Sequence, residues 1–289
     1  MPSKPIPCRL FVILASEASK AVIFRRGPHL WTQIILWDTK TDSFTEGQWF
    51  KGTLYQKRCD LSPDGSKMIY FAAKHYKARF RDAERLLTTW TAVSRPPYLT
   101  ALAITKTIGT YDGGGYFGDN NTIYINQGRY APDKDNVPPV VVEKLNVSQD
   151  VEFKPIAPDG HFFYEEGLYD LLLKRRGWQA DLNKDPIQWR KDNPNHTYSL
   201  FMTSISGFGN NEICQFSLKN HLNNVEFTIN CNEWADWDQQ GRLVYTHEGK
   251  LFLGQIWKDQ IESVQLADFN PNKLRLIESP AWAKTWDQV

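Results

Sequence analysis

The chain has 289 residues, and its 34 Lys and Arg residues nearly balance its 33 Asp and Glu residues, which gives a formal net charge of +1. This balance argues against a dedicated nucleic-acid-binding protein, because such proteins carry a basic domain or stripe. Hydrophobic residues make up 41% of the chain and aromatic residues 13%. A chain of this length and composition can bury a sizeable core, which excludes an intrinsically disordered protein.

The spacing of cysteine and histidine predicts neither a metal site nor a cofactor. The cysteines form no Cys-x-x-Cys pair, and the six histidines lack the spacing of a metal-binding motif. No apolar run reaches the roughly 18 residues of a transmembrane helix, and the apolar stretch 10–15 is too short for a signal peptide. We therefore predict a cytoplasmic protein with reduced thiols and no membrane contact. The four cysteines are Cys8, Cys59, Cys214 and Cys231.

A turn followed by a strand recurs along the chain. The strong copies span residues 59–71, 153–164 and 234–245, and each places a glycine two residues before an apolar run that ends in Tyr or Phe. Asp and Gly accept turn dihedral angles, and the apolar run suits a half-buried strand, so each copy predicts a β-hairpin. Weaker copies lie at 19–24 and 119–125, and a further strand is expected at 198–206. The steps are roughly 40 to 56 residues, a period typical of four-stranded propeller blades.

A second turn motif lies out of phase with the first. It comprises residues 37–39, 181–183 and 268–270, and strands are expected after each copy, at 44–50, 186–190 and 274–277. The position of these turns predicts the hairpin between the third and fourth strands of a blade.

Two segments interrupt this pattern. Residues 74–88 contain no Gly or Pro, and Arg81, Glu84 and Arg85 are spaced for ion pairs on a helix, so we predict a short, mildly basic helical insertion. The leucines of residues 167–177 would allow a helix, but this segment follows a Pro-Asp-Gly turn. We therefore expect the β-structure to continue there.

These observations predict an all-β protein built as a single β-propeller domain over residues 1–289. The period favours about six four-stranded blades, with five or seven also allowed. Residues 9–15 and 274–281 are the candidates to close the ring and so protect the sheet edges.

The motif Ser62-Pro63-Asp64-Gly65, followed by the run 67–71, resembles the blade motif of WD40-like (TolB-type) β-propellers. Residues 90–102, 113–117 and 267–270 are similar to bacterial propeller-like proteins of uncharacterised function. The resemblance implies the architecture and assigns no reaction and no catalytic residue, because propellers serve many functions.

The first candidate site pairs a segment with two prolines and a glycine-rich loop. An arginine at a strand end beside an acidic glycine loop could bind a carboxylate, a phosphate or a sugar hydroxyl. In the structural alternative, the arginine pairs with a carboxylate between blades and the glycines form a tight turn. The candidate residues are Arg95, Tyr98, Asp112, Gly113, Gly114, Gly115 and Tyr116, with Glu165 as a further polar contact.

Tryptophan supplies the second candidate. Most of the 11 tryptophans are expected to pack between blades. Trp234 and Trp237, near a strand start, could instead form a stacking platform for sugars or a binding hot spot for a protein. The chain has no Gly-x-Ser-x-Gly elbow, so no catalytic residue is assigned.

Two functions follow as hypotheses. The first is a non-enzymatic protein-interaction or scaffold module, whose partner docks on the loop face and on Arg79, Arg81 and Arg85 of the insertion. The alternative is an enzyme or sensor that binds a carbohydrate or another small polar ligand in the central cavity. Nucleic acid is an unlikely partner at this net charge.

Overall fold

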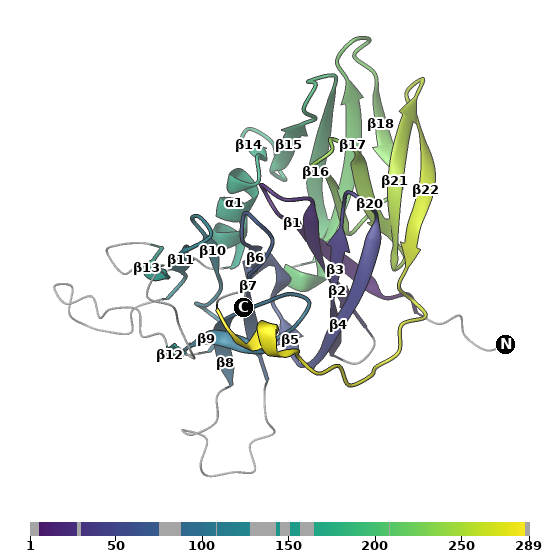
Figure 1. The fold of residues 1–289 in the computed structure, drawn as a ribbon. Coiled ribbons are helices and arrows are strands. Elements are labelled where there is room, and N and C mark those ends of the chain that lie inside the picture. Colours follow the sequence, from purple (N-terminus) through teal and green to yellow (C-terminus); the bar gives the residue numbers. More distant parts are fainter. Residues whose placement is uncertain are drawn as a thin grey trace.

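The computed structural model describes residues 6–27, 30–74, 88–107, 109–127, 143–144, 151–156, 165–207 and 209–286, with 143, 144, 165 and 166 described by backbone alone. These residues form five sheets, almost entirely antiparallel, together with one α-helix and short 3-10 turns (Figure 1). The all-β prediction is confirmed at this level. The predicted helix at 74–88 lies mostly outside the described residues, as do Arg79, Arg81 and Arg85.

The first two sheets are built from the N-terminal part of the chain. The first has the order β1-β2-β3-β4, and its turn after Trp37 joins the third and fourth strands, as predicted. In the second sheet, β6 and β7 form the hairpin predicted around Gly65. The strands are β1 (Arg9–Leu14), β2 (Lys20–Arg26), β3 (Trp31–Asp38), β4 (Ser43–Lys51), β5 (Thr53–Leu54), β6 (Asp60–Leu61), β7 (Met68–Ala73), β8 (Thr89–Ser94), β9 (Ala101–Lys106) and β12 (Glu143–Lys144).

The remaining three sheets follow in chain order. The third joins β10, β11 and β13, and β11 pairs with β13 in parallel. The fourth runs β14-β15-β16-β17-β18 and the fifth β19-β20-β21-β22. The strands are β10 (Gly115–Phe117), β11 (Thr122–Ile125), β13 (Glu152–Pro155), β14 (Gln179–Asp181), β15 (Gln188–Asp192), β16 (Tyr198–Ser206), β17 (Ile213–Asn220), β18 (Glu226–Ile229), β19 (Trp234–Trp237), β20 (Leu243–His247), β21 (Lys250–Trp257) and β22 (Gln260–Asp268).

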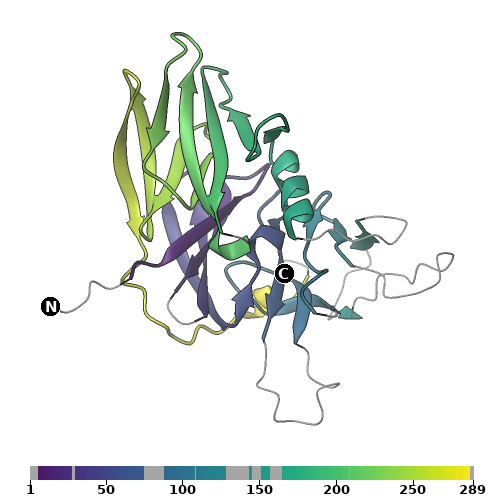
Figure 2. The same cartoon turned by 180° about the vertical axis from the view of Figure 1, so that it is seen from behind.

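The β-structure expected at 167–177 is wrong, because this segment is the helix α1 (Glu165–Arg175). Leu168 and Leu172, four residues apart, are both buried on the helix face. The helix ends at Gly177, whose φ of 87° allows the Trp178 N–H to donate to the Leu173 carbonyl oxygen at 3.0 Å. Figure 2 shows α1 between the third and fourth sheets.

Two further expectations are corrected. The turn at 181–183 joins the first two strands of the fourth sheet rather than its third and fourth. Residues 274–277 form no strand, and the segment after β22 crosses the first and second sheets in irregular conformation, ending in the turn η4 (Ala281–Lys284; Figure 1). The strand β1 forms where predicted but pairs with β2 of its own sheet. The count of six blades stays a prediction beside the five described sheets.

Three apolar clusters pack between sheets rather than within one. The largest joins the first, second and fifth sheets and includes Trp37 and Met68. The second lies between the fourth and fifth sheets around Phe216. The third lies between the second and third sheets and takes in Phe117 and Trp286. Strands between these clusters, such as β7, are buried throughout, whereas outer strands such as β22 are largely exposed.

A polar contact joins the first and last sheets. Arg242 donates to both carboxylate oxygens of Asp42, at 2.8 and 3.0 Å, and to Asp238 at 2.7 Å. Gln239 donates to the carbonyl oxygens of Ala15 and Lys20. This contact brings the N-terminal and C-terminal sheets side by side. Among the described residues, no helix is long and apolar enough to cross a membrane.

Candidate functional site

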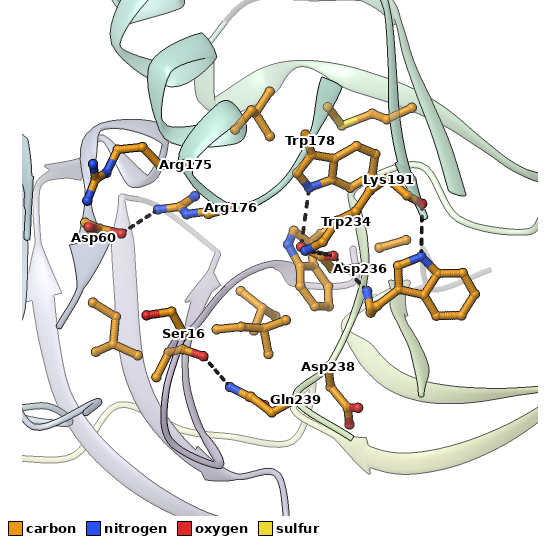
Figure 3. Close-up of a pocket in the computed structure, with 18 of the residues that line it drawn as sticks. Ser16, Asp60, Arg175, Arg176, Trp178, Lys191, Trp234, Asp236, Asp238 and Gln239 are labelled. Carbon is orange, nitrogen blue, oxygen red and sulfur yellow. Dashed lines mark hydrogen bonds and ion pairs between the residues drawn. The ribbon is translucent and has the colours of Figure 1, made fainter. Parts of the chain in front are cut away.

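A cavity of about 560 Å³ lies where the sheets meet (Figure 3). Its walls come from the first strands of three sheets (β1, β10 and β19), from β6 and β15, and from the C-terminal turn of α1. The volume is within the roughly 300–1,000 Å³ of pockets that hold small molecules. Each of these elements contributes side chains to the wall, among them Phe11, Asp60, Phe117, Arg175, Lys191 and Trp234.

Three indole rings line the cavity, and two of their N–H groups bond within the protein. The Trp178 Nε1 donates to an Asp236 carboxylate oxygen at 3.4 Å, and the Trp237 Nε1 donates to the Lys191 carbonyl oxygen at 3.1 Å. Trp234 is only 7% exposed, yet its Nε1 has no hydrogen-bond partner among the described residues. Trp234 therefore brings a free donor to the cavity wall.

Ion pairs hold the polar part of the wall. Asp60 pairs with Arg176 at 3.1 Å, and Asp236 pairs with Lys191 at 2.6 Å (Figure 3). The first pair links the second sheet to α1, and the second links the fifth sheet to the fourth. Their carboxylates are 13% and 8% exposed, so water screens them little. Both pairs offer oxygen acceptors and nitrogen donors to a polar molecule.

Two carboxyl groups of the lining have shifted pKa values of opposite sign. Burial raises the pKa of Glu233, although hydrogen bonds from the Leu10 N–H and the Arg9 side chain oppose the shift. Burial also pushes the pKa of Asp192 upward, but hydrogen bonds from Arg190 and other neighbours outweigh it and leave that pKa below its usual value. The carboxylates of Glu233 and Asp192 therefore already accept hydrogen bonds from groups of the protein.

Arg175 lies at the edge of the cavity, and it is exposed. One Nη donates to the Phe117 carbonyl oxygen at 2.8 Å, and the guanidinium lies 4.2 Å from the centre of the Tyr116 ring. Tyr116 in turn stacks on Tyr124 at 4.8 Å. These contacts fix the direction of the arginine.

The structure places Trp234 and Trp237 in the cavity wall and Tyr116 beneath Arg175, so three predicted residues are at or beside this site. Arg95 is elsewhere. It is 2% exposed and donates to the carbonyl oxygens of Thr285 and Trp286 in the C-terminal segment. Tyr98 packs edge-on against Trp282, also in that segment. Carbonyl groups, rather than the expected carboxylate, accept from Arg95 in these two bonds.

The glycine-rich loop is held by contacts within the protein. The Asp112 carbonyl oxygen accepts from Arg58 at 3.0 Å, and the Gly113 N–H donates to the Asn126 carbonyl oxygen. At Gly114, where φ is 84°, an added Cβ would lie 2.4 Å from the Arg58 carbonyl oxygen. Gly115 is as confined, since its Cβ would meet the carbonyl oxygen of Tyr124 at 2.1 Å. A ligand role for this loop stays a prediction.

The other expectations are open or limited in scope. The side chain of Glu165 lies outside the described residues, as does the arginine-bearing insertion. Within the described part of the chain, no three His, Cys, Asp or Glu side chains are placed to bind a metal ion. All four cysteines are free and buried, and burial raises the pKa of Cys59 and Cys231 to about 12.

Sequence reasoning missed Asp60 and Asp236, although a signal for them exists. Asp60 precedes Gly65 by five residues, and Asp236 precedes Gly241 by five residues. The two carboxylates thus occupy the same position in two copies of the hairpin motif, on strands that both face the cavity. Arg175, at the end of α1, and Arg176 and Trp178, which follow it, had no such signal, because the helix was not expected.

Comparison with known proteins adds little to this geometry. No protein-family model and no curated protein matches the chain. Among solved structures, the crystal structure of the tricorn protease matches at 11% identity and a TM-score of 0.27, over 92% of this chain and 27% of that chain. The chain thus spans about a quarter of that protein's length, and a likeness this low carries no argument about fold or activity. The WD40-like type stays a prediction.

Proposed function

We propose that the sheets are blades of one β-propeller and that the protein binds a small polar ligand in the central cavity. The support for the propeller is that β1, β6, β10 and β19 face one cavity. The equivalent positions of Asp60 and Asp236 agree with it, because rotation about a central axis brings matching residues of different blades to the same ring.

The unpartnered N–H of Trp234 carries the ligand proposal. The indole N–H groups of Trp178 and Trp237 bond within the protein, whereas Trp234 lines a space large enough for a small molecule and its N–H has no acceptor among the described residues. A hydroxyl or ether oxygen of a ligand would accept from it, and the indole faces suit the apolar side of a sugar ring.

The site supports binding better than catalysis. A general acid or base must be free to reach the reacting group. Here Asp60, Asp192 and Asp236 are each held by a cation, and Glu233 accepts from Arg9 at 3.1 Å and from the Leu10 N–H at 3.0 Å. We therefore propose a binding or sensing role. A protein partner, predicted to dock on the loop face and on the insertion at 74–88, stays a prediction, and we base the proposed function on the cavity.

A ligand screen followed by one matched pair of variants tests this proposal. Thermal-shift assays with sugars, nucleotides and small carboxylic acids identify compounds that stabilise the protein, and titration calorimetry measures their affinity. Trp234→Phe removes the indole donor and keeps an aromatic ring, whereas Trp257→Phe makes a similar change at a side chain that is 71% exposed. We expect Trp234→Phe to weaken binding about 5- to 30-fold, equivalent to 1–2 kcal/mol, and Trp257→Phe to leave it unchanged.

Two results would contradict the proposal. One is a screen in which no polar compound stabilises the wild-type protein. The other is a ligand that binds the folded Trp234→Phe variant as tightly as the wild type, because that ligand would lie away from the indole. Circular dichroism and the melting temperature of each variant verify that it is folded.

A further inference from the structure

We infer that the ligand of the central cavity carries a carboxylate or phosphate group and that Arg175 binds it. This inference rests on the proposed function and deepens it, because it names the chemical class of the ligand. That class is a hydroxylated small molecule with one anionic group, such as a sugar acid or a sugar phosphate.

The pairing of charges around the cavity singles out Arg175. Among the described residues, six carboxylates line the cavity; five have a cationic partner, and three of those partners lie outside the lining. The pairs are Asp60–Arg176, Asp192–Arg190, Glu233–Arg9, Asp236–Lys191 and Asp238–Arg242. The sixth carboxylate, Glu17, is exposed in the turn after β1. Among the described residues, Arg175 is the lining cation without a carboxylate partner.

The contacts of Arg175 leave it ready to bind an anion. The Phe117 carbonyl oxygen takes one N–H of an Nη group, and the Tyr116 ring covers one face of the guanidinium. Among the described residues, no acceptor takes the N–H groups at Nε and the other Nη, so these groups can donate the two parallel hydrogen bonds that a carboxylate or phosphate accepts. Because the side chain is already oriented, little rotamer freedom is lost on binding.

The neighbouring charges favour an anion at this end of the cavity. Arg175 and Arg176 follow one another at the C-terminal end of α1, and the ion pair to Asp60 runs from Arg176 (Figure 3). Of these two adjacent cations, Arg176 is the one with a carboxylate partner among the described residues. The indole of Trp234 lies in the same cavity, so a ligand anchored on Arg175 would present its hydroxyl or ether oxygens to that N–H.

Matched neutral and anionic compounds test the inference. The probes are glucose, glucuronate and glucose 6-phosphate, with the corresponding galactose series and with glycerol, glycerate and glycerol 3-phosphate, all titrated at low ionic strength so that the exposed arginine is not screened. The variants are Arg175→Gln, Lys174→Gln as a control at the exposed neighbouring residue outside the lining, and Tyr116→Leu, which removes the ring beneath the guanidinium.

We expect the wild type to bind at least one anionic member about tenfold or more tightly than its neutral counterpart. Arg175→Gln abolishes this preference, Tyr116→Leu reduces it, and Lys174→Gln retains it. Preference for the carboxylate or for the phosphate within a series identifies which anion the site takes.

The outcomes separate the inference from the function on which it rests. Equal binding of neutral and anionic members by the wild type, or a preference that survives Arg175→Gln, overturns the anion site and leaves the ligand-binding function standing. If no compound of either kind binds the wild type, the inference and the proposed function are both overturned.

Discussion

Trp286 gives the sharpest stability prediction, because it attaches the C-terminal segment to two sheets. Its side chain is 4% exposed, its Nε1 donates to the Leu102 carbonyl oxygen at 3.1 Å, and its ring packs edge-on against Phe153 at 6.2 Å. Replacing a buried tryptophan by alanine lowers the free energy of unfolding by about 3–5 kcal/mol, and this total includes the loss of its hydrogen bond. We expect Trp286→Ala to lower the free energy of unfolding by about 4 kcal/mol.

Trp282 provides the control within the same segment. It is 45% exposed and its described ring contact is with Tyr98, at 5.5 Å. An aromatic pair of this kind contributes about 0.5–1.5 kcal/mol, so Trp282→Ala is expected to cost about 1 kcal/mol.

Urea unfolding followed by far-UV circular dichroism measures both variants without relying on tryptophan fluorescence. The slope of the free energy against urea should match the wild type, which shows that the unfolded states are comparable. If Trp286→Ala costs no more than Trp282→Ala, the C-terminal segment does not hold the second and third sheets together, and the reasoning is wrong.

Three further predictions concern stability and reactivity. Arg242→Met should lower the free energy of unfolding in urea by about 3–5 kcal/mol, because it leaves the buried carboxylate of Asp238 without its cation. A loss below about 1 kcal/mol would contradict this. Burial pushes the pKa of Asp64 upward, but hydrogen bonds from Ser62 and Ser66 and the charge of Lys67 outweigh it and leave the pKa below its usual 3.8. Asp64 therefore adds stability above that pH, which is lost as the pH falls through its native pKa; Asp64→Asn should flatten this acid limb in unfolding measured at several pH values. Gly114→Ala should lower the free energy of unfolding by at least about 2 kcal/mol, since φ is positive and the Arg58 carbonyl oxygen occupies the space of the new Cβ. An unchanged melting temperature would show that the loop can relax around the new side chain.

The hairpins were predictable because their chemistry is local. In the first motif, one Asp64 oxygen accepts from the Ser62 hydroxyl at 2.6 Å and from the Ser66 N–H at 2.9 Å, and Gly65 adopts a φ of 68°. In the last motif, Asp238 stands at the position of Ser62 and its carboxylate accepts from the Gln240 N–H at 2.9 Å, while Gly241 adopts a φ of 73°. A turn whose partners lie within a few residues can be inferred from the sequence alone.

The helix α1 was missed although its end is marked in the sequence. Gly177 follows three consecutive basic residues, which is the usual pattern at a helix C-terminus. The spacing of Leu168 and Leu172 agrees with a helix as well. The expectation of a repeating strand outweighed these local signals, and here the local signals were correct.

Arg95 was predicted to bind a ligand or partner, and its contacts with the C-terminal segment could not be inferred from the sequence. The carbonyl oxygen of Thr285 that accepts from it lies 190 residues away in the chain. Its conformation depends on the irregular C-terminal segment, where a strand had been expected. Contacts of this range depend on the assembled sheets, and no spacing in the sequence encodes them.

The departure from the sequence repeat accounts for the character of the proposed site. Where two copies of the hairpin motif repeat, they place like groups, Asp60 and Asp236, on the wall of the cavity. Where α1 stands between two sheets, it brings cations instead: Arg176 neutralises Asp60, and Arg175 remains without a carboxylate. A fully repeated ring would surround the cavity with equivalent acidic groups, which repel an anion. The departure from the repeat therefore gives the cavity one end that favours an anion, and the ligand selectivity proposed for Arg175 depends on it.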